Sequence, residues 1–209
     1  MRKSSLRKSR FLYLHPEVNS GKIASLEALQ EEYTDYLKVC VDQMFQKHRF
    51  KMSLSEKKNF FPPCKTLSSN IVRNVQDQAI GIVSGWAASK YTTKIKGFLK
   101  GQLKNGDLTK EYFRILCTIG KYSIGKASAR VPQEMLDLYW SLLLDEEVSG
   151  RLPTVSTRCG MRLCVNTATF ETSEDTKLTA WWLGFSHLDV GKPRIQIPLV
   201  PSPYIKKSI

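Results

Sequence analysis

The chain has 209 residues and a formal net charge of +13, from 32 Lys and Arg against 19 Asp and Glu. Its hydrophobic fraction of 42% is that of a globular protein and argues against intrinsic disorder. No run of about 18 apolar residues occurs, so the sequence predicts no membrane span. The excess of positive charge favours a polyanionic partner, namely RNA, DNA or an anionic membrane surface.

The N-terminus and the cysteines bear on the compartment. Residues 1–10 are basic but are not followed by an apolar segment and a cleavage site, so they do not form a secretory signal. A mitochondrial presequence is the alternative, because the segment is rich in Arg and Ser and free of acids. The 5 cysteines are scattered and odd in number, which suits a reducing cytosol better than a disulfide framework. We therefore expect a cytoplasmic protein.

The first predicted elements are a strand and a long helix. Residues 5–14 predict a strand that ends before Pro16, because a proline disfavours helical structure at the residue that precedes it. A sustained apolar stripe then predicts a helix from about Lys22 to His48. Residues 49–65 predict a polar connection that ends in a pair of prolines.

A second helix is predicted over residues 66–90, with Ser68 or Ser69 as its N-cap. Its apolar face is expected to contain Ile71, Val75, Gln78 or Ala79, Ile82 and Trp86. The opposite face is expected to carry polar residues, namely Arg73, Asn74, Gln76, Asp77 and Ser84. Amides there could bond to phosphates, sugars or base edges. The alternative is an ordinary core helix with a solvated outer face.

The next part of the chain predicts further helices. Residues 90–104 either continue the second helix or form a separate one, which their glycines weaken. A short helix is expected over 110–119 after an Asn-Gly turn, and another over 132–147. A basic loop at 120–131 is predicted between them.

The C-terminal part predicts strands at 161–170, 178–188 and 194–200. A lone N-terminal strand needs partners, because buried backbone groups without hydrogen bonds are costly, and only these strands are available. We therefore expect an α+β fold, in which a small β-barrel is built from both ends of the chain and a helical domain is inserted in it. The expected divisions are 1–18, 19–150 and 151–209.

The sequence lacks the common signatures of catalysis. No glycine-rich phosphate loop, HExxH, GxSxG or paired CxxC motif occurs. Cys159 and Cys164 could form half of a zinc site, but no second Cys/His pair completes it. The acids lie on helix faces rather than at facing strand ends, so no two-metal nuclease centre is predicted. We expect no enzyme activity, no cofactor and no bound metal.

A concentration of lysines and arginines lies between residues 90 and 130, against only Asp107 and Glu111. Lys96, Lys100 and Lys104 are four residues apart and therefore share one helix face. Such a row can follow a phosphate backbone through a salt-sensitive interaction that does not depend on sequence. A solvated lysine-rich surface with no partner is the alternative.

Several segments together resemble a known family. These are the strand Arg10-Phe-Leu-Tyr-Leu-His-Pro16, the helical segments Leu67-Ser-Ser-Asn70 and Gln76-Asp-Gln-Ala79, and the C-terminal segments Leu152-Pro153, Met161-Arg-Leu163 and Ile195-Gln-Ile-Pro-Leu199. The chain resembles the N-terminal half of the TnpB (OrfB) proteins of insertion sequences and of the compact type V CRISPR effectors. The resemblance implies a wedge β-barrel interrupted by a helical recognition lobe. The family's RuvC-like nuclease domain and its zinc ribbon have no counterpart in the sequence.

The resemblance implies a non-catalytic RNA-binding and DNA-binding module of an RNA-guided protein in the bacterial cytoplasm. Its partners would be a guide or other structured RNA, a target DNA, and a separate chain that carries a RuvC-like nuclease or transposition proteins, with no membrane involved. The alternative is a basic structural or assembly protein that binds RNA, such as a component of an organellar ribosome. The predicted nucleic-acid-binding residues are Arg7, Lys8, Arg10, Arg73, Asn74, Gln76, Lys94, Lys96, Lys100, Lys104, Lys121, Lys126 and Arg130.

Overall fold

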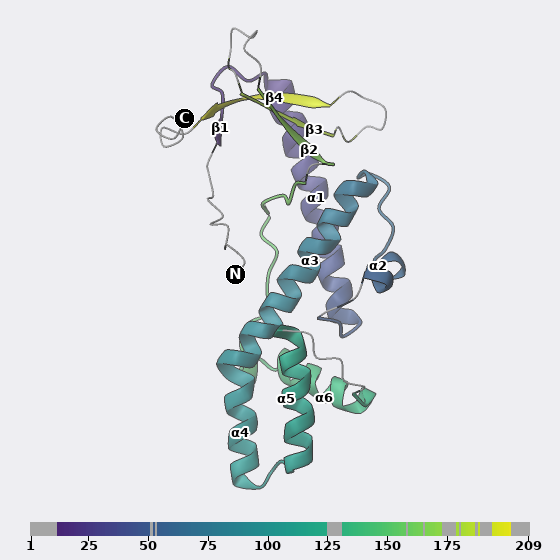
Figure 1. Ribbon diagram of the computed structural model, residues 1–209, viewed down its shortest axis with the longest axis vertical. Coiled ribbons are helices and arrows are strands. Elements are labelled where there is room, and N and C mark those ends of the chain that lie inside the picture. Colours follow the sequence, from purple (N-terminus) through teal and green to yellow (C-terminus); the bar gives the residue numbers. More distant parts are fainter. Residues whose placement is uncertain are drawn as a thin grey trace, which may run out of the picture.

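The computed structural model describes residues 12–50, 52, 54–124, 131–157, 159–164, 166–172, 179, 181–186, 188 and 194–201. The molecule is elongated, with a sheet at one end, a hairpin of α4 and α5 at the other, and α1 and α3 side by side between them (Figure 1). The elements are β1 (Leu12–Leu14), α1 (Ser20–Gln46), α2 (Leu54–Phe60), α3 (Ser69–Lys90), the π-helical turn η1 (Tyr91–Ile95), α4 (Lys96–Asn105), α5 (Lys110–Ile124), α6 (Gln133–Leu144), α7 (Glu146–Ser149), β2 (Ala168–Thr172), β3 (Trp181–Phe185) and β4 (Ile195–Pro201).

The sheet joins both ends of the described chain, as the sequence predicts, and the fold is α+β. Its strand order is β1-β4-β3-β2 and every neighbouring pair is antiparallel, with Leu12 opposite Pro201 in the pair that joins the two ends. The expectation of a closed barrel is wrong for the described residues, because β1 and β2 are the two edges of an open sheet. The strand expected over 161–170 begins only at Ala168.

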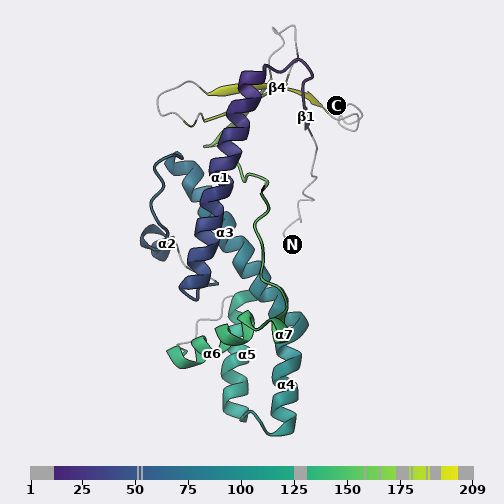
Figure 2. The same cartoon turned by 180° about the vertical axis from the view of Figure 1, so that it is seen from behind.

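The main core lies between α1 and α3, which cross the middle of the molecule (Figure 2). Buried residues recur at helical spacing on both helices, as expected for two amphipathic helices that share an interface. On α1 they include Leu29, Tyr33, Leu37, Cys40 and Met44, and on α3 Ile71, Val75, Ala79, Val83 and Ala87. Ile82 and Trp86, expected on this face, are partly buried and pack against the core. Ser68 precedes α3 but makes no capping hydrogen bond through its side chain.

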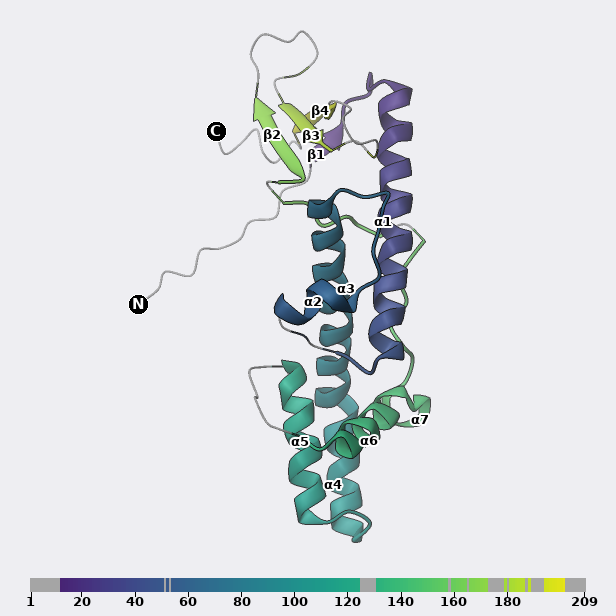
Figure 3. The ribbon, with the colours of Figure 1, turned by 90° about the vertical axis from the view of Figure 1, so that its right-hand side faces the viewer.

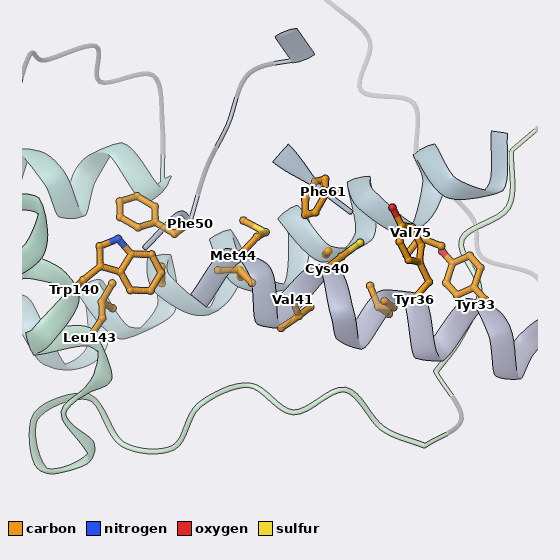
Figure 4. Close-up of a cluster of buried hydrophobic side chains, with 14 of the residues drawn as sticks. Tyr33, Tyr36, Cys40, Val41, Met44, Phe50, Phe61, Val75, Trp140 and Leu143 are labelled. Carbon is orange, nitrogen blue, oxygen red and sulfur yellow. The ribbon is translucent and has the colours of Figure 1, made fainter. Parts of the chain in front are cut away.

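An aromatic cluster closes the end of α1 that is distant from the sheet (Figure 4). Trp140 of α6 is fully buried, and its ring lies 5.6 Å from that of Phe50 and 6.0 Å from that of Phe45. Aromatic pairs at such separations add to the stability that burial alone provides. The cluster therefore attaches α6 to the body formed by α1 and α3.

Two sequence predictions for the helices are wrong. The expected polar connection at 49–65 contains α2, which an ion pair between the buried Lys57 and Asp77 of α3 holds in place. The expected loop after residue 119 begins instead as a further turn of α5, which continues through Gly120 to Ile124. A Cβ atom at Gly120 would lie 2.1 Å from the ring of Tyr91, so this glycine allows close packing rather than a turn.

An extended segment, which we call the return segment, connects α7 to the sheet. It comprises the described part of residues 151–167 and runs back along the molecule beside α1 and α3 (Figure 3). Because it has almost no regular secondary structure, its backbone groups need partners from neighbouring side chains. Within the described residues, no helix is both long enough and apolar enough to cross a membrane.

Candidate nucleic-acid interface

Local sequence features explain why α4 and α5 form a hairpin. Ile95 at the end of η1 and Leu99, one turn later on α4, are buried. The side of α4 that faces away from them is exposed. The helix ends at Gly106, whose φ of 85° is the left-handed conformation that favours glycine at a helix C-terminus. The hydroxyl of Thr109 then accepts a hydrogen bond from the amide of Tyr112, 3.3 Å away, and caps α5.

Basic side chains cover the outside of this hairpin. The exposed cations are Lys94, Lys96, Lys100, Lys104, Lys110, Arg114 and Lys121. Over the described residues, none of them lies within 4.0 Å of a carboxylate as an ion pair. Phe98 and Tyr112 are 38% and 49% exposed on the same two helices. The hairpin therefore presents unneutralised positive charge together with aromatic rings on which bases could stack.

The candidates on α3 behave differently. Arg73 is exposed, but the side chain of Gln76 is partly buried and donates a hydrogen bond to the hydroxyl of Tyr36 at 3.2 Å. Asn74 is only 7% exposed, and its amide donates to Oγ1 of Thr167 at 3.2 Å. The expectation that Asn74 lies on the outer face is wrong, because this amide holds the return segment and is not available to a phosphate.

The polar side of the α1–α3 pair is used to hold the return segment. The hydroxyl of Tyr33 donates to Oε1 of Gln78 at 2.6 Å and accepts the backbone N–H of Arg162 at 3.1 Å. The amide of Gln78 donates to the carbonyl of Gly160 at 3.0 Å, and the amide of Gln30 donates to that of Cys159 at 3.1 Å. The sequence signal for this role is the spacing of Asn74 and Gln78, one turn apart and beside the apolar stripe.

The two cysteines that could have formed half of a zinc site both lie on the return segment. Cys164 is exposed, and the amide of Asn74 and the hydroxyl of Thr167 lower the pKa of its thiol to about 7. Hydrogen bonds to a thiolate favour the charged form, which explains this direction. Among the described residues, no group of three or more His, Cys, Asp or Glu is placed to hold a metal ion.

The remaining candidates, Arg7, Lys8, Arg10, Lys126 and Arg130, lie outside the described residues. The structure thus brings Lys96, Lys100, Lys104 and Lys121 together on one hairpin, with Lys94 on the adjoining η1. It adds Lys110 and Arg114, which belong to the basic stretch but were not among the predicted contacts. Arg73 is exposed on α3, outside this hairpin. No protein-family model matches the sequence, and neither a curated protein nor a solved structure gives a match.

Proposed function

We propose that the chain is a non-catalytic nucleic-acid-binding module and that the outside of the α4–α5 hairpin is its binding surface. The observation that supports the proposal is the row of exposed lysines and arginines without ion-pair partners on these two helices. Each such cation can displace a condensed counterion from a phosphate backbone, and the release of counterions drives binding.

From helix geometry we infer that the basic row of α4 and that of α5 face the same side of the hairpin; the rows are Lys96, Lys100 and Lys104, and Lys110, Arg114 and Lys121. Lys100 follows the buried Leu99 by one residue, and Lys121 follows the buried Gly120 by one residue. One residue turns an α-helix by about 100°, always in the same sense. Because the two helices run in opposite directions, an equal rotation from buried faces that point toward each other would bring both rows to one side. A surface two helices wide fits a nucleic-acid backbone better than a single row does.

The finer form of the proposal follows the TnpB resemblance. The sheet would correspond to a wedge domain that holds a guide RNA, and the helical part to a recognition lobe that contacts the duplex of guide and target DNA. The arrangement of one sheet from both ends of the described chain, with the described helices between its first and second strands, supports this form. A RuvC-like nuclease or a transposition protein would then be a separate partner chain in the bacterial cytoplasm.

Charge reversal on α4 tests the binding surface. The variant Lys96→Glu/Lys100→Glu/Lys104→Glu should bind a structured RNA more weakly. The negative slope of log K against log salt should become less steep by about 2.7, which is 0.9 for each lost phosphate contact. The matched control is Lys47→Glu/Arg49→Glu/Lys65→Glu, which changes the net charge equally at exposed positions away from the hairpin. Equal binding by both variants at 100 mM salt would exclude α4 as the contact surface.

Sequencing of co-purified RNA separates the RNA-guided form from the structural alternative. The chain would be expressed together with its neighbouring genomic DNA, purified, and its bound RNA sequenced. One abundant RNA from the adjacent locus would support a guide-binding protein. A heterogeneous mixture that is removed by salt would favour a general RNA-binding or assembly role, because phosphate contacts alone do not select a sequence.

A further inference from the structure

A second basic site lies at the opposite end of the molecule, where the start of α1 meets β4. An open hollow of about 390 Å³ there is lined by Asn19, Gly21, Lys22, Ser25, Arg194, Ile195 and Gln196. None of the described lining residues is acidic, and neither cation forms an ion pair with a described residue. Over the described residues, the hollow therefore combines two cations and two amide side chains and contains no acidic side chain.

The geometry of Lys22 adds an independent observation. Its ammonium group lies 5.8 Å from the centre of the Trp182 ring, a cation–π contact that positions the charge beside the interior strand β3. Arg194 immediately precedes β4, one of the two interior strands, so its backbone is fixed by the start of that strand. Both cations are therefore attached to regular elements, which favours a preorganised site over a mobile surface charge.

The backbone N–H groups at the start of α1 are already hydrogen-bonded within the chain. The backbone N–H of Gly21 donates to Oδ1 of Asn19 at 2.7 Å, and the N–H of Lys22 donates to the carbonyl of Asn19 at 3.0 Å. These N–H groups already have acceptors, so the side chains of Lys22 and Arg194 would make the contacts. The positive end of the α1 dipole still adds a favourable field for an anion.

We propose that this hollow binds a phosphate group between Lys22 and Arg194. A phosphate has several oxygens that can accept hydrogen bonds from two cations at once, and an arginine can bind it with two parallel bonds. The group could belong to free phosphate or to a nucleic-acid strand. The site is separate from the hairpin and does not depend on the nucleic-acid contacts proposed there.

The test uses tryptophan fluorescence of the full chain, because Trp182 lies beside Lys22. The probes are inorganic phosphate, a short RNA with a 5′-hydroxyl, and the same RNA with a 5′-phosphate. We expect a saturable change in fluorescence with at least one probe. Loss of this change in the variant Trp182→Phe would assign the signal to Trp182. A response to inorganic phosphate would show that a free phosphate group is sufficient for binding. A response to RNA but not to inorganic phosphate would show that binding needs the nucleic-acid strand.

The variant Lys22→Gln/Arg194→Gln should weaken this binding by about tenfold or more, because it removes charge-assisted hydrogen bonds. Lys47→Gln/Lys65→Gln is the matched control and should respond like the wild type. Equilibrium dialysis with radiolabelled probes repeats the comparison without relying on the indole. If the double variant fails to fold, Arg194→Gln alone replaces it, because this residue is exposed.

Absence of saturable binding for all probes, or equal binding by the double variant, would overturn the proposed site. The hairpin variant Lys96→Glu/Lys100→Glu/Lys104→Glu should keep the phosphate response. Failure of the hairpin as a nucleic-acid surface is therefore distinguishable from failure of this site.

Discussion

The outer side of α4 and the polar side of α3 were both predicted to contact nucleic acid, but the structure places their side chains differently. Lys96, Lys100 and Lys104 of α4 are exposed and have no ion-pair partner among the described residues. Asn74 and Gln76 of α3, also predicted to contact nucleic acid, instead bond to side chains of the same chain. The first set is available to a partner, and the second set holds the fold together.

The difference comes from the cost of burying each kind of group. A buried ammonium group needs a counter-charge, and the buried Lys57 has one in Asp77 of α3. An amide needs only a hydrogen-bond partner, which a return segment without regular structure can provide. A row of lysines therefore predicts a surface, whereas a row of amides is compatible with either a surface or an internal contact.

Two glycines in the hairpin region provide the largest expected contrast. Gly120→Ala places a Cβ atom 2.1 Å from the Tyr91 ring and should lower the free energy of unfolding by about 3 kcal/mol. Gly97→Ala meets no atom within 4 Å and should raise it by about 0.5–1 kcal/mol, because alanine is the better helix former. Chemical denaturation measures both, and equal effects would contradict the packing of α5 against η1.

Asn74 gives the next contrast, between binding and stability. Asn74→Ala leaves Thr167 without its amide donor and should lower the free energy of unfolding by about 2 kcal/mol, measured by denaturant titration. Arg73→Ala, its exposed neighbour, should change stability little and serves as the control. If Asn74→Ala weakened RNA binding while leaving the unfolding midpoint unchanged, the amide would be a contact residue after all.

The sequence was sufficient to predict the long helices and the joining of the chain ends. The apolar stripe around Leu37 and Val75 is continuous and strongly periodic, and a strand at the N-terminus has few possible partners. The α2 helix was missed because a segment of seven residues contains too few turns to show a period. The continuation of α5 was missed because the basic segment from residue 120 was interpreted as a loop, although Gly120 lies within the helix and gives room for the neighbouring Tyr91 ring.

The candidate site was predictable only where charge determines exposure. The lysines of α4 were placed correctly on the surface because their spacing puts them on one face and a charged group resists burial. The role of Asn74 could not be predicted, because its partner Thr167 is distant in sequence and belongs to a segment without periodicity. Contacts of that kind depend on how the whole chain folds back and leave little local signal.

The smallest expected effect concerns Cys164, which shares the amide of Asn74. Because hydrogen bonds from Asn74 and Thr167 lower its pKa to about 7, the reactive thiolate should be half formed near neutral pH. The alkylation rate with iodoacetamide, followed by mass spectrometry, should rise through about pH 7 and level off above it. In Asn74→Ala the midpoint should move up toward the usual thiol value of about 8.5.

Cys40 is buried with its pKa raised to about 12 and should stay unmodified as an internal control. The same midpoint near 8.5 in both proteins would show that Asn74 does not bond to this thiol in solution, and would leave its hydrogen bond to Thr167 as its contact with the return segment.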